Sequence, residues 1–513
     1  MKNKKIIIGS SSVLLLTLIT TVVVVLIDKK EVKYDVTKEE AKEAYDLLNK
    51  SINRNQTYYD FISGKTINYS LGEFNAEMKE SNASDEYGYS QYLLSKNDSS
   101  TPNLNIIDYD STTSYKEYVE YQVTVSSEGL YELELDYYLN DNILTNPTIA
   151  ISINELDTYQ YSEQSTIDVP LKWDGTEAYE SEKSFPIDSY EDETVPSNVR
   201  LKEWSTLKMY DNKYSTSTPL LFNLNKGDNN IFVRVVSSNC PLILGNLKAT
   251  SPKKLITYEE YKETSLVKAG KEVNDLVSKN AIFYHEKNSS YLTLSSENNP
   301  CCAPFESTKS KLNVMSGNSW KTAGQSLTYT IKVNESGLYK LGFHYSTSKE
   351  DYASFRSIYI NDEIPFEELR NYSFNDTSTS KWANETLSDK DGNPYLIYFQ
   401  EGKEYKITLK AELDPVYEIA NMLQLVVDHI NNFSLDILKI TGSDVDEDRN
   451  WELTNYIPET VEYLEAYQTL IQYLIMEGSN YSLEGTNSST LSYMGKALAT
   501  LKKLMKKPDD LPL

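Results

Sequence analysis

The chain has 513 residues, enough for two or three domains that each bury a core. Its formal net charge is -26 at pH 7, so it repels the phosphates of nucleic acids and the headgroups of anionic lipids. We therefore expect no nucleic-acid partner, and contact with a membrane only through an anchor.

The N-terminus predicts that anchor. Residues 6 to 27, "IIIGSSSVLLLTLITTVVVVLI", hold no charge, and a helix that rises about 1.5 Å per residue makes them long enough to cross a hydrocarbon layer of about 30 Å. A cleaved signal peptide is the alternative, but no small-x-small exit follows the apolar stretch. Lys2, Lys4 and Lys5 favour a cytoplasmic N-terminus. The prediction is a single-pass protein of the cell membrane with the bulk of the chain extracellular.

Two helix starts follow along the chain. Thr37 with Glu40, and Thr257 with Glu260, have the spacing of a capping box, in which each side chain bonds the other's backbone. Each predicted helix precedes one copy of a repeated pattern.

The repeat is the main organising feature. Residues 121–137, "YQVTVSSEGLYELELDY", return 208 residues later as residues 329–345, "YTIKVNESGLYKLGFHY". Apolar and polar residues alternate on both sides of a glycine, which predicts two strands joined by a tight connection. The many short strands predict a mainly β fold with two tandem jelly-roll β-sandwiches and linking helices. The first copy also carries an insertion of roughly thirty residues within residues 159–204, which we expect to form loops.

After the second copy the periodicity becomes helical. Residues 414–433 predict a buried helix, and residues 457–477 and 488–507 predict an antiparallel helical hairpin at the C-terminus. The predicted domains are a transmembrane anchor (1–30), a juxtamembrane helix (31–55), a first sandwich (56–252), a linker helix (253–280), a second sandwich with an inserted helix (281–442) and a helical region (443–513).

Several stretches of the second copy, among them "GNSWKTAGQSLTYTIKVNESGLYKLGFHY" and "KITGSDVDEDRNWELTNYIPE", carry a family resemblance. With the tandem copies they resemble the N-terminal accessory region of bacterial extracellular solute-binding proteins of carbohydrate ABC importers, over roughly residues 70–513. The resemblance implies galactose-binding-like sandwiches. The family's two-lobed solute-binding domain has no counterpart after "LKKLMKKPDDLPL", so capture of a transported sugar by that domain is not expected here.

Sugars are recognised by exposed aromatic faces beside amide, carboxylate or guanidinium groups. The candidate ligand-binding residues are Trp173, Trp204, Trp320, Trp382 and Arg356. Trp173, in the insertion, is the first choice. The alternative for each tryptophan is packing in a core, and for Arg356 a bond to a neighbouring strand.

The resemblance also implies one metal site. Glu77 and Glu286 open the two copies at matching positions, where sandwiches of this shape hold a structural calcium near the last strand. Asp436 would complete the site in the second copy, whereas the first copy offers Asn246. The alternative is a solvated or hydrogen-bonded glutamate, and no other cofactor is expected.

The sequence thus predicts a membrane-anchored binding protein for carbohydrate or a cell-surface glycan, associated with an ABC-type sugar uptake system. The alternative is a structural or assembly protein that binds another polypeptide and no sugar. We expect no enzymatic activity, because the chain has no GxSxG, HExxH, P-loop or dinucleotide motif.

Overall fold

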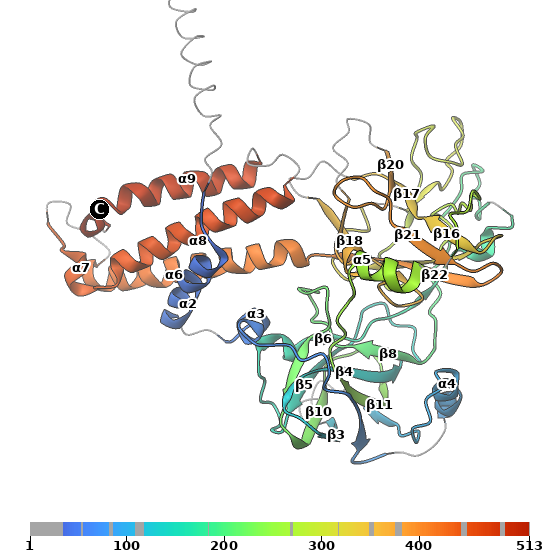
Figure 1. Ribbon diagram of the computed structural model, residues 1–513, viewed down its shortest axis with the longest axis horizontal. Coiled ribbons are helices and arrows are strands. Elements are labelled where there is room, and N and C mark those ends of the chain that lie inside the picture. The colour runs from blue at the N-terminus through green and yellow to red at the C-terminus, as the bar shows by residue number, and fades with distance from the viewer. Residues whose placement is uncertain are drawn as a thin grey trace, which may run out of the picture. The chain divides into compact units, whose positions relative to one another are not determined.

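The computed structural model describes residues 34–52, 55–81, 86–107, 117–182, 184–266, 270–315, 318–347, 353–374, 382–442, 449–482 and 488–511. The chain divides into two compact units. The larger is Arg54–Glu418, and the smaller combines Met1–Asn53 with Ile419–Leu513. Figure 1 labels the strands of the larger unit and the helices of the smaller one. The predicted anchor lies outside the described residues, and none of the helices within them is long and apolar enough to cross a membrane.

The first copy forms a sandwich-like pair of layers, as predicted. Its strands are β1 (Glu73–Met78), β2 (Asn105–Ile107), β3 (Tyr118–Val125), β4 (Gly129–Tyr138), β5 (Thr148–Ile153), β6 (Ile167–Asp168), β8 (Ser205–Lys208), β9 (Leu221–Leu224), β10 (Gly227–Ser237) and β11 (Leu242–Thr250). The strand order is β6-β5-β10-β3-β1-β11-β4-β8, with β2 beside β11 and β9 beside β4. Strands β3 and β4 do not pair with each other, so the short glycine connection carries the chain from one layer to the other.

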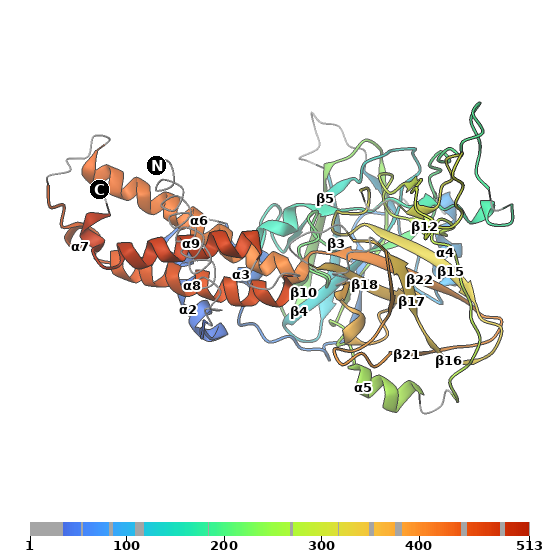
Figure 2. The same ribbon diagram turned by 90° about the horizontal axis from the view of Figure 1, so that it is seen from above.

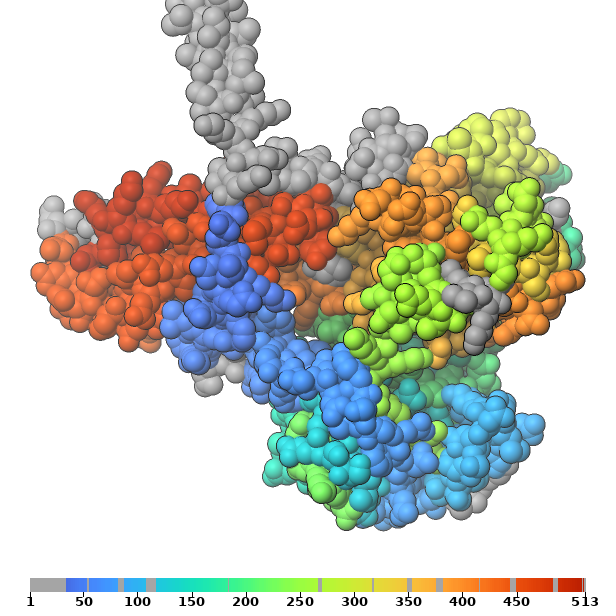
Figure 3. Space-filling model, in the orientation of Figure 1, coloured from blue at the N-terminus to red at the C-terminus, as the bar shows by residue number. Residues whose placement is uncertain are grey.

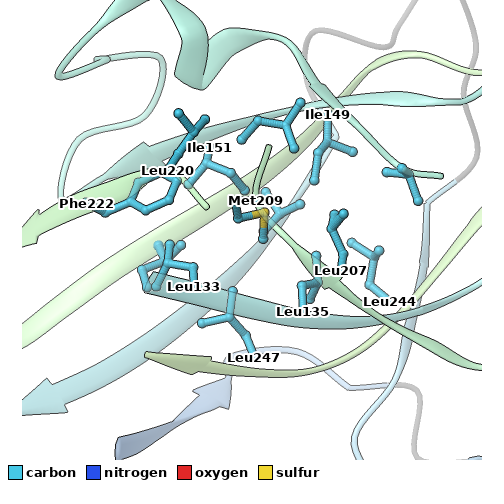
Figure 4. Packing of buried hydrophobic residues seen from close by; sticks show 14 of the residues in the cluster. Leu133, Leu135, Ile149, Ile151, Leu207, Met209, Leu220, Phe222, Leu244 and Leu247 are labelled. Carbon is cyan, nitrogen blue, oxygen red and sulfur yellow. The ribbon is translucent and has the colours of Figure 1, made fainter. Parts of the chain in front are cut away.

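The alternating pattern explains the core of this sandwich. Tyr121, Val123 and Val125 of β3 are at most 1% exposed, and every second residue of β4 is buried in the same way. Figure 4 shows side chains from β4, β5, β9 and β11 packed together in this cluster, including Leu133, Ile151, Phe222 and Leu244. Because β11 contributes residues such as Leu244 and Leu247 that are fully buried, it completes the core as well as the sheet.

The second copy repeats most of this arrangement. Its strands are β12 (Glu286–Lys287), β13 (Leu294–Ser295), β14 (Val314–Met315), β15 (Ser326–Lys332), β16 (Gly337–Lys340), β17 (Gly342–Tyr345), β18 (Ser354–Ile360), β19 (Tyr372–Phe374), β20 (Ala383–Thr386), β21 (Leu396–Phe399) and β22 (Glu404–Glu412). Strands β15, β22 and β18 run side by side, as β3, β10 and β5 do in the first copy (Figure 2). The opposite layer is divided into two ribbons, β16 with β21 and β17 with β20.

Within the part of the second copy that the structure describes, no strand is the counterpart of β11. After β10 the chain makes β11, but after β22 it makes α6 (Asp414–Thr441). The helix begins where predicted and continues past residue 433, because apolar residues keep helical spacing through Ile437 and Ile440. The place beside β12 is taken instead by β7 (Trp173–Asp174) of the first copy's insertion. Strand β12 thus lies between β15 and β7, as β1 lies between β3 and β11.

The insertion is mostly irregular, as expected for loops, but it is docked on the second copy. Thr176 donates its N–H to the carbonyl of Tyr284 at 2.8 Å, and Phe185 packs in a core cluster with residues such as Phe283. Burial opposes ionisation of Glu177, but hydrogen bonds from Lys279, Thr330 and His285 lower its pKa to about 2. The insertion therefore joins the two copies by strand pairing and by buried contacts.

Short helices precede or flank the sandwiches. They are α3 (Tyr58–Ile62), α4 (Tyr89–Ser95) and α5 (Tyr258–Tyr261). Helix α5 has the predicted capping box at Thr257 and Glu260 but ends early, followed by a π-helical turn through Leu266. Residues 271–273 are extended instead of helical because Lys271 and Val273 exchange backbone hydrogen bonds with Leu338 of β16.

The smaller unit is helical. It contains α2 (Lys38–Ser51), the greater part of α6, α7 (Leu453–Tyr456), α8 (Thr460–Tyr481) and α9 (Ser489–Leu504). The capping box of Thr37 and Glu40 is formed, and α8 packs against both α2 and α9. Figure 3 shows α2, in blue, against the orange and red surface of the C-terminal helices. The predicted C-terminal helical region is confirmed.

A buried histidine lies inside this helical unit. His429 of α6 is 3% exposed, and its Nδ1 is 2.6 Å from the hydroxyl of Tyr467 on α8. Its Nε2 contacts Ser51 Oγ, which donates its own proton to the carbonyl of Leu48. Burial lowers the pKa of His429.

A substitution at Gly175 tests whether the insertion packs on the second copy. A Cβ at this position would lie 1.9 Å from the carbonyl oxygen of Tyr284, a backbone atom that cannot rotate away. Replacement of Gly175 by Ala should lower the free energy of unfolding of the larger unit by at least about 2 kcal/mol, measured by denaturant titration. Gly495→Ala in α9 is the control, because nothing lies within 4 Å of the added atom and alanine favours a helix. Equal stability of the two variants would contradict the docking.

The pH dependence of stability tests the burial of His429 in the helical unit. Because its pKa is lower in the folded state, the unfolded chain binds more protons between that value and the ordinary value of 6.5. The unit should therefore lose stability as the pH falls through and below 6.5. Amide hydrogen exchange of α6 and α8 as a function of pH should report this loss, and His429→Gln should flatten it, whereas His344→Gln in the larger unit should not. A pH profile unchanged by His429→Gln would be the contrary result.

Candidate functional site

Two of the predicted tryptophans are in cores. Trp173 is 2% exposed in β7, with the Arg200 guanidinium 5.2 Å from its ring centre. Trp204 is 6% exposed and lies 4.1 Å from the ring of Tyr89, while its Nε1 donates to the carbonyl of Tyr87. Neither ring offers a face to solvent, and Trp173, the first choice from sequence, packs in the core of the first sandwich.

Trp320 and Arg356 are brought together. The Arg356 guanidinium lies 4.7 Å from the centre of the Trp320 ring, and it donates to the backbone carbonyls of Trp320 and Phe355. Burial lowers the pKa of Arg356 to about 10, although the charge of Glu412 opposes this shift. The pair is held by its own contacts, which agrees with the structural alternative for Arg356.

Next to Arg356 is a buried charged group between the copies. Lys410 Nζ of β22 lies 3.4 Å from Glu412 Oε1 and 3.9 Å from the ring centre of Tyr210, which belongs to the first copy. Both charged side chains are at most 10% exposed, and burial raises the pKa of Glu412. A desolvated pair of this kind penalises removal of either partner, so it favours one arrangement of the two copies.

Trp382 is half-buried, like Trp320, and lies directly before β20. It matches Trp204 of the first copy in its place before the glycine-turn strands, but there helix α4 and Tyr89 cover the tryptophan. No helix of the described second copy takes the place of α4, and Trp382 remains half-buried with the His344 imidazole stacked on it at 5.1 Å.

Trp382 lies at one end of what we call the ribbon face, the outer face of the β17–β20 pair. This face carries Trp382, His344, Asn384, Thr386 and the bare Gly342. Residues 342, 344, 384 and 386 are exposed, because side chains two apart on a strand share one face. The side-chain pattern of an aromatic ring flanked by polar groups is the one that sugar recognition needs.

The hydrogen bonds on the ribbon face define its chemistry. His344 Nδ1 is 2.8 Å from Asn384 Oδ1, so this nitrogen carries the imidazole proton of the neutral ring. Nε2 is then a hydrogen-bond acceptor, and the Asn384 amide nitrogen is a donor, neither with a partner among the described residues. An acceptor beside a donor is complementary to adjacent hydroxyl groups.

The inner side of the ribbon is fixed by buried bonds. The carboxylate of Glu385 accepts hydrogen bonds of 2.7 Å from the hydroxyls of Tyr345 and Tyr372. Burial raises the pKa of Tyr372 to about 12, so its hydroxyl stays a donor. Since both strands are held from below, the polar groups on the ribbon face are presented in a defined geometry.

The predicted calcium residues do not fit a metal site. Glu77 is exposed in β1, and the negative charge of Glu286 raises the pKa of Lys172. Asp436 is on helix α6, where its carboxylate pairs with Lys439 at 2.7 Å. Asp436 was assigned near a last strand that the second copy does not form. Within the described ranges, no group of three or more His, Cys, Asp or Glu side chains could hold a metal ion.

Sequence analysis missed His344 and Asn384. A signal was present, because His344 matches Asp136 of the first copy, 208 positions earlier. Asp136 is buried and accepts the hydroxyl of Tyr89 from α4 at 2.8 Å. The matching position thus holds a covered carboxylate in the first copy and an exposed imidazole in the second.

Comparisons with known proteins agree with the helical part of the resemblance. Residues 418–513 match a family model described as "Bacterial solute-binding protein, 4-helix bundle domain". No curated protein is significantly similar to the chain.

Solved structures with some similarity include carbohydrate-binding modules. A family 35 module from Clostridium thermocellum is 15% identical over 29% of this chain and 92% of its own, with a TM-score of 0.15. The Podospora anserina GH26-CBM35 mannanase is 12% identical over 36% of this chain and 28% of its own, with a TM-score of 0.16. The tandem CBM22 modules of Paenibacillus barcinonensis Xyn10C are 8% identical over 62% and 80%, with a TM-score of 0.12. TM-scores this low do not establish a common fold, so the firm similarity is that of the C-terminal helices to the four-helix-bundle domain of bacterial solute-binding proteins.

Proposed function

We propose that this protein binds carbohydrate outside the cell through the ribbon face and releases it chemically unchanged. The observation that carries the proposal is the half-buried ring of Trp382 with an imidazole acceptor and an amide donor beside it on one exposed face. A pyranose presents an apolar face to such a ring and adjacent hydroxyls to the polar groups.

The setting we propose is the surface of a cell that takes up sugars through an ABC-type importer. The family match of residues 418–513 supports it, because that helical domain is named for bacterial solute-binding proteins. The apolar residues 6–27 would anchor the chain in the membrane as a single-pass protein, and the sandwiches would be galactose-binding-like modules that bring glycans to the surface.

A glycan array with the full-length chain in detergent tests this function. Retained glycans should then be titrated by calorimetry, where Trp382→Ala and Asn384→Ala should each weaken binding by about tenfold or more, equivalent to roughly 1.4 kcal/mol. Tyr190→Ala is the matched control, because that ring is 80% exposed and lies in the insertion. The recovered glycan should have an unchanged mass.

Retention of no glycan would refute the proposal, as would a Trp382→Ala variant that binds like the unmodified protein. Glycan binding that Tyr190→Ala weakens and Trp382→Ala does not would move the site to the insertion.

A further inference from the structure

The two copies differ in how well their matching core residues are covered. Tyr121, Val123, Leu133, Leu135 and Tyr137 of the first copy are at most 3% exposed. Their counterparts 208 positions later, which all pack against the core of the second sandwich, are only partly buried: Tyr329, Ile331, Leu341, Phe343 and Tyr345.

The difference is located where a strand is missing. In the first copy, β11 pairs with β4 through contacts such as Leu247 with Leu135 and Ala249 with Leu133. The matching positions in the second copy are Phe343 and Leu341, in and next to β17. Among the strands that the structure describes, β17 pairs with β20 alone. We call the edge of β17 that faces away from β20 the β17 edge.

The described residues outside β17 and β20 pair at the neighbouring places, and none of the described strands pairs at this one. Strand β7 pairs with β12, and residues 271–273 pair with β16 at Leu338. The chain after β22 is committed to α6 and cannot return as a strand. The β17 edge therefore combines backbone groups directed away from β20 with apolar side chains that are incompletely covered.

We infer that the β17 edge accepts an extended strand of another polypeptide, which pairs with β17 as β11 pairs with β4 in the first copy. The first copy defines the chemistry of the occupant. In β11 the residues Leu242, Leu244, Leu247 and Ala249 are fully buried, so the partner segment must be extended and carry aliphatic side chains on one face. Backbone hydrogen bonds to β17 would supply affinity, and the aliphatic face would supply specificity.

The probe for this inference is a synthetic peptide with the sequence of residues 242–250, LILGNLKAT, added to the full-length protein. At ten times its dissociation constant, the peptide should slow amide hydrogen exchange in residues 341–345 by roughly tenfold. A peptide with Asp in place of both Leu244 and Leu247 should give no protection, because a charged residue cannot enter the apolar side.

Variants on the inner side of β17 and on the ribbon face separate the two proposed sites. Phe343→Ala should weaken peptide binding, whereas Asn384→Ala and Trp382→Ala should leave it unchanged. The exchange measurement on the unmodified chain keeps the test valid if Phe343→Ala fails to fold. Absence of saturable binding would overturn the inference, as would protection at β12 in place of β17 or displacement of the peptide by a glycan. None of these results depends on whether the ribbon face binds sugar.

Discussion

The pairing of β7 with β12 is the interaction on which the larger unit depends. The second sandwich cannot make its own last strand, because the chain that follows β22 becomes α6. A strand from the first copy's insertion occupies the place beside β12, with Trp173 and Asp174 opposite Lys287 and Glu286. Unpaired backbone groups next to a core are costly, so the two sandwiches are stabilised as one body and not as independent modules.

The insertion therefore has a different role from that of a variable surface loop. It contacts the second copy in three ways. Strand β7 pairs with β12, Phe185 packs in a core cluster of the second copy, and carboxylates accept hydrogen bonds from the second copy's backbone. Glu193, for example, accepts the N–H of Leu312 at 2.9 Å and pairs with Lys311 at 3.2 Å. The buried Lys410 and Glu412 add a charged contact near Tyr210. Such contacts set the relative position of the copies, because a buried polar group tolerates few alternative partners.

Duplication followed by different coverage explains the two surfaces that we propose as functional. Helix α4 covers Trp204 and Asp136 in the first copy, while in the second the matching His344 is exposed and the matching Trp382 is half-buried. Strand β11 covers β4, while the matching β17 has no such neighbour among the described strands. The second copy thus presents two surfaces on the β17–β20 ribbon. Its outer face is polar and aromatic and is suited to a sugar, and the edge of β17 is suited to a polypeptide.

The sequence by itself determined the local elements, because their signals are local. The period-two alternation gave the strands around Gly129 and Gly337, the capping boxes gave the helix starts at Thr37 and Thr257, and helical spacing gave the C-terminal region. The sequence also named Trp382, but it ranked Trp173 higher, since exposure cannot be derived from residue type.

Tertiary structure alone decided which strands became neighbours and which rings became buried. Asp436 was placed near a last strand because sandwiches of this shape hold calcium there, yet it lies on a helix whose apolar spacing continues through Ile440. Trp173 packs in the core of the first sandwich, while its backbone pairs with Glu286–Lys287, a segment 113 positions away. Burial and strand pairing bring together residues that are far apart in the chain. Which residues meet depends on all the apolar surfaces and strand edges of the folded unit, and a local sequence pattern does not contain that information.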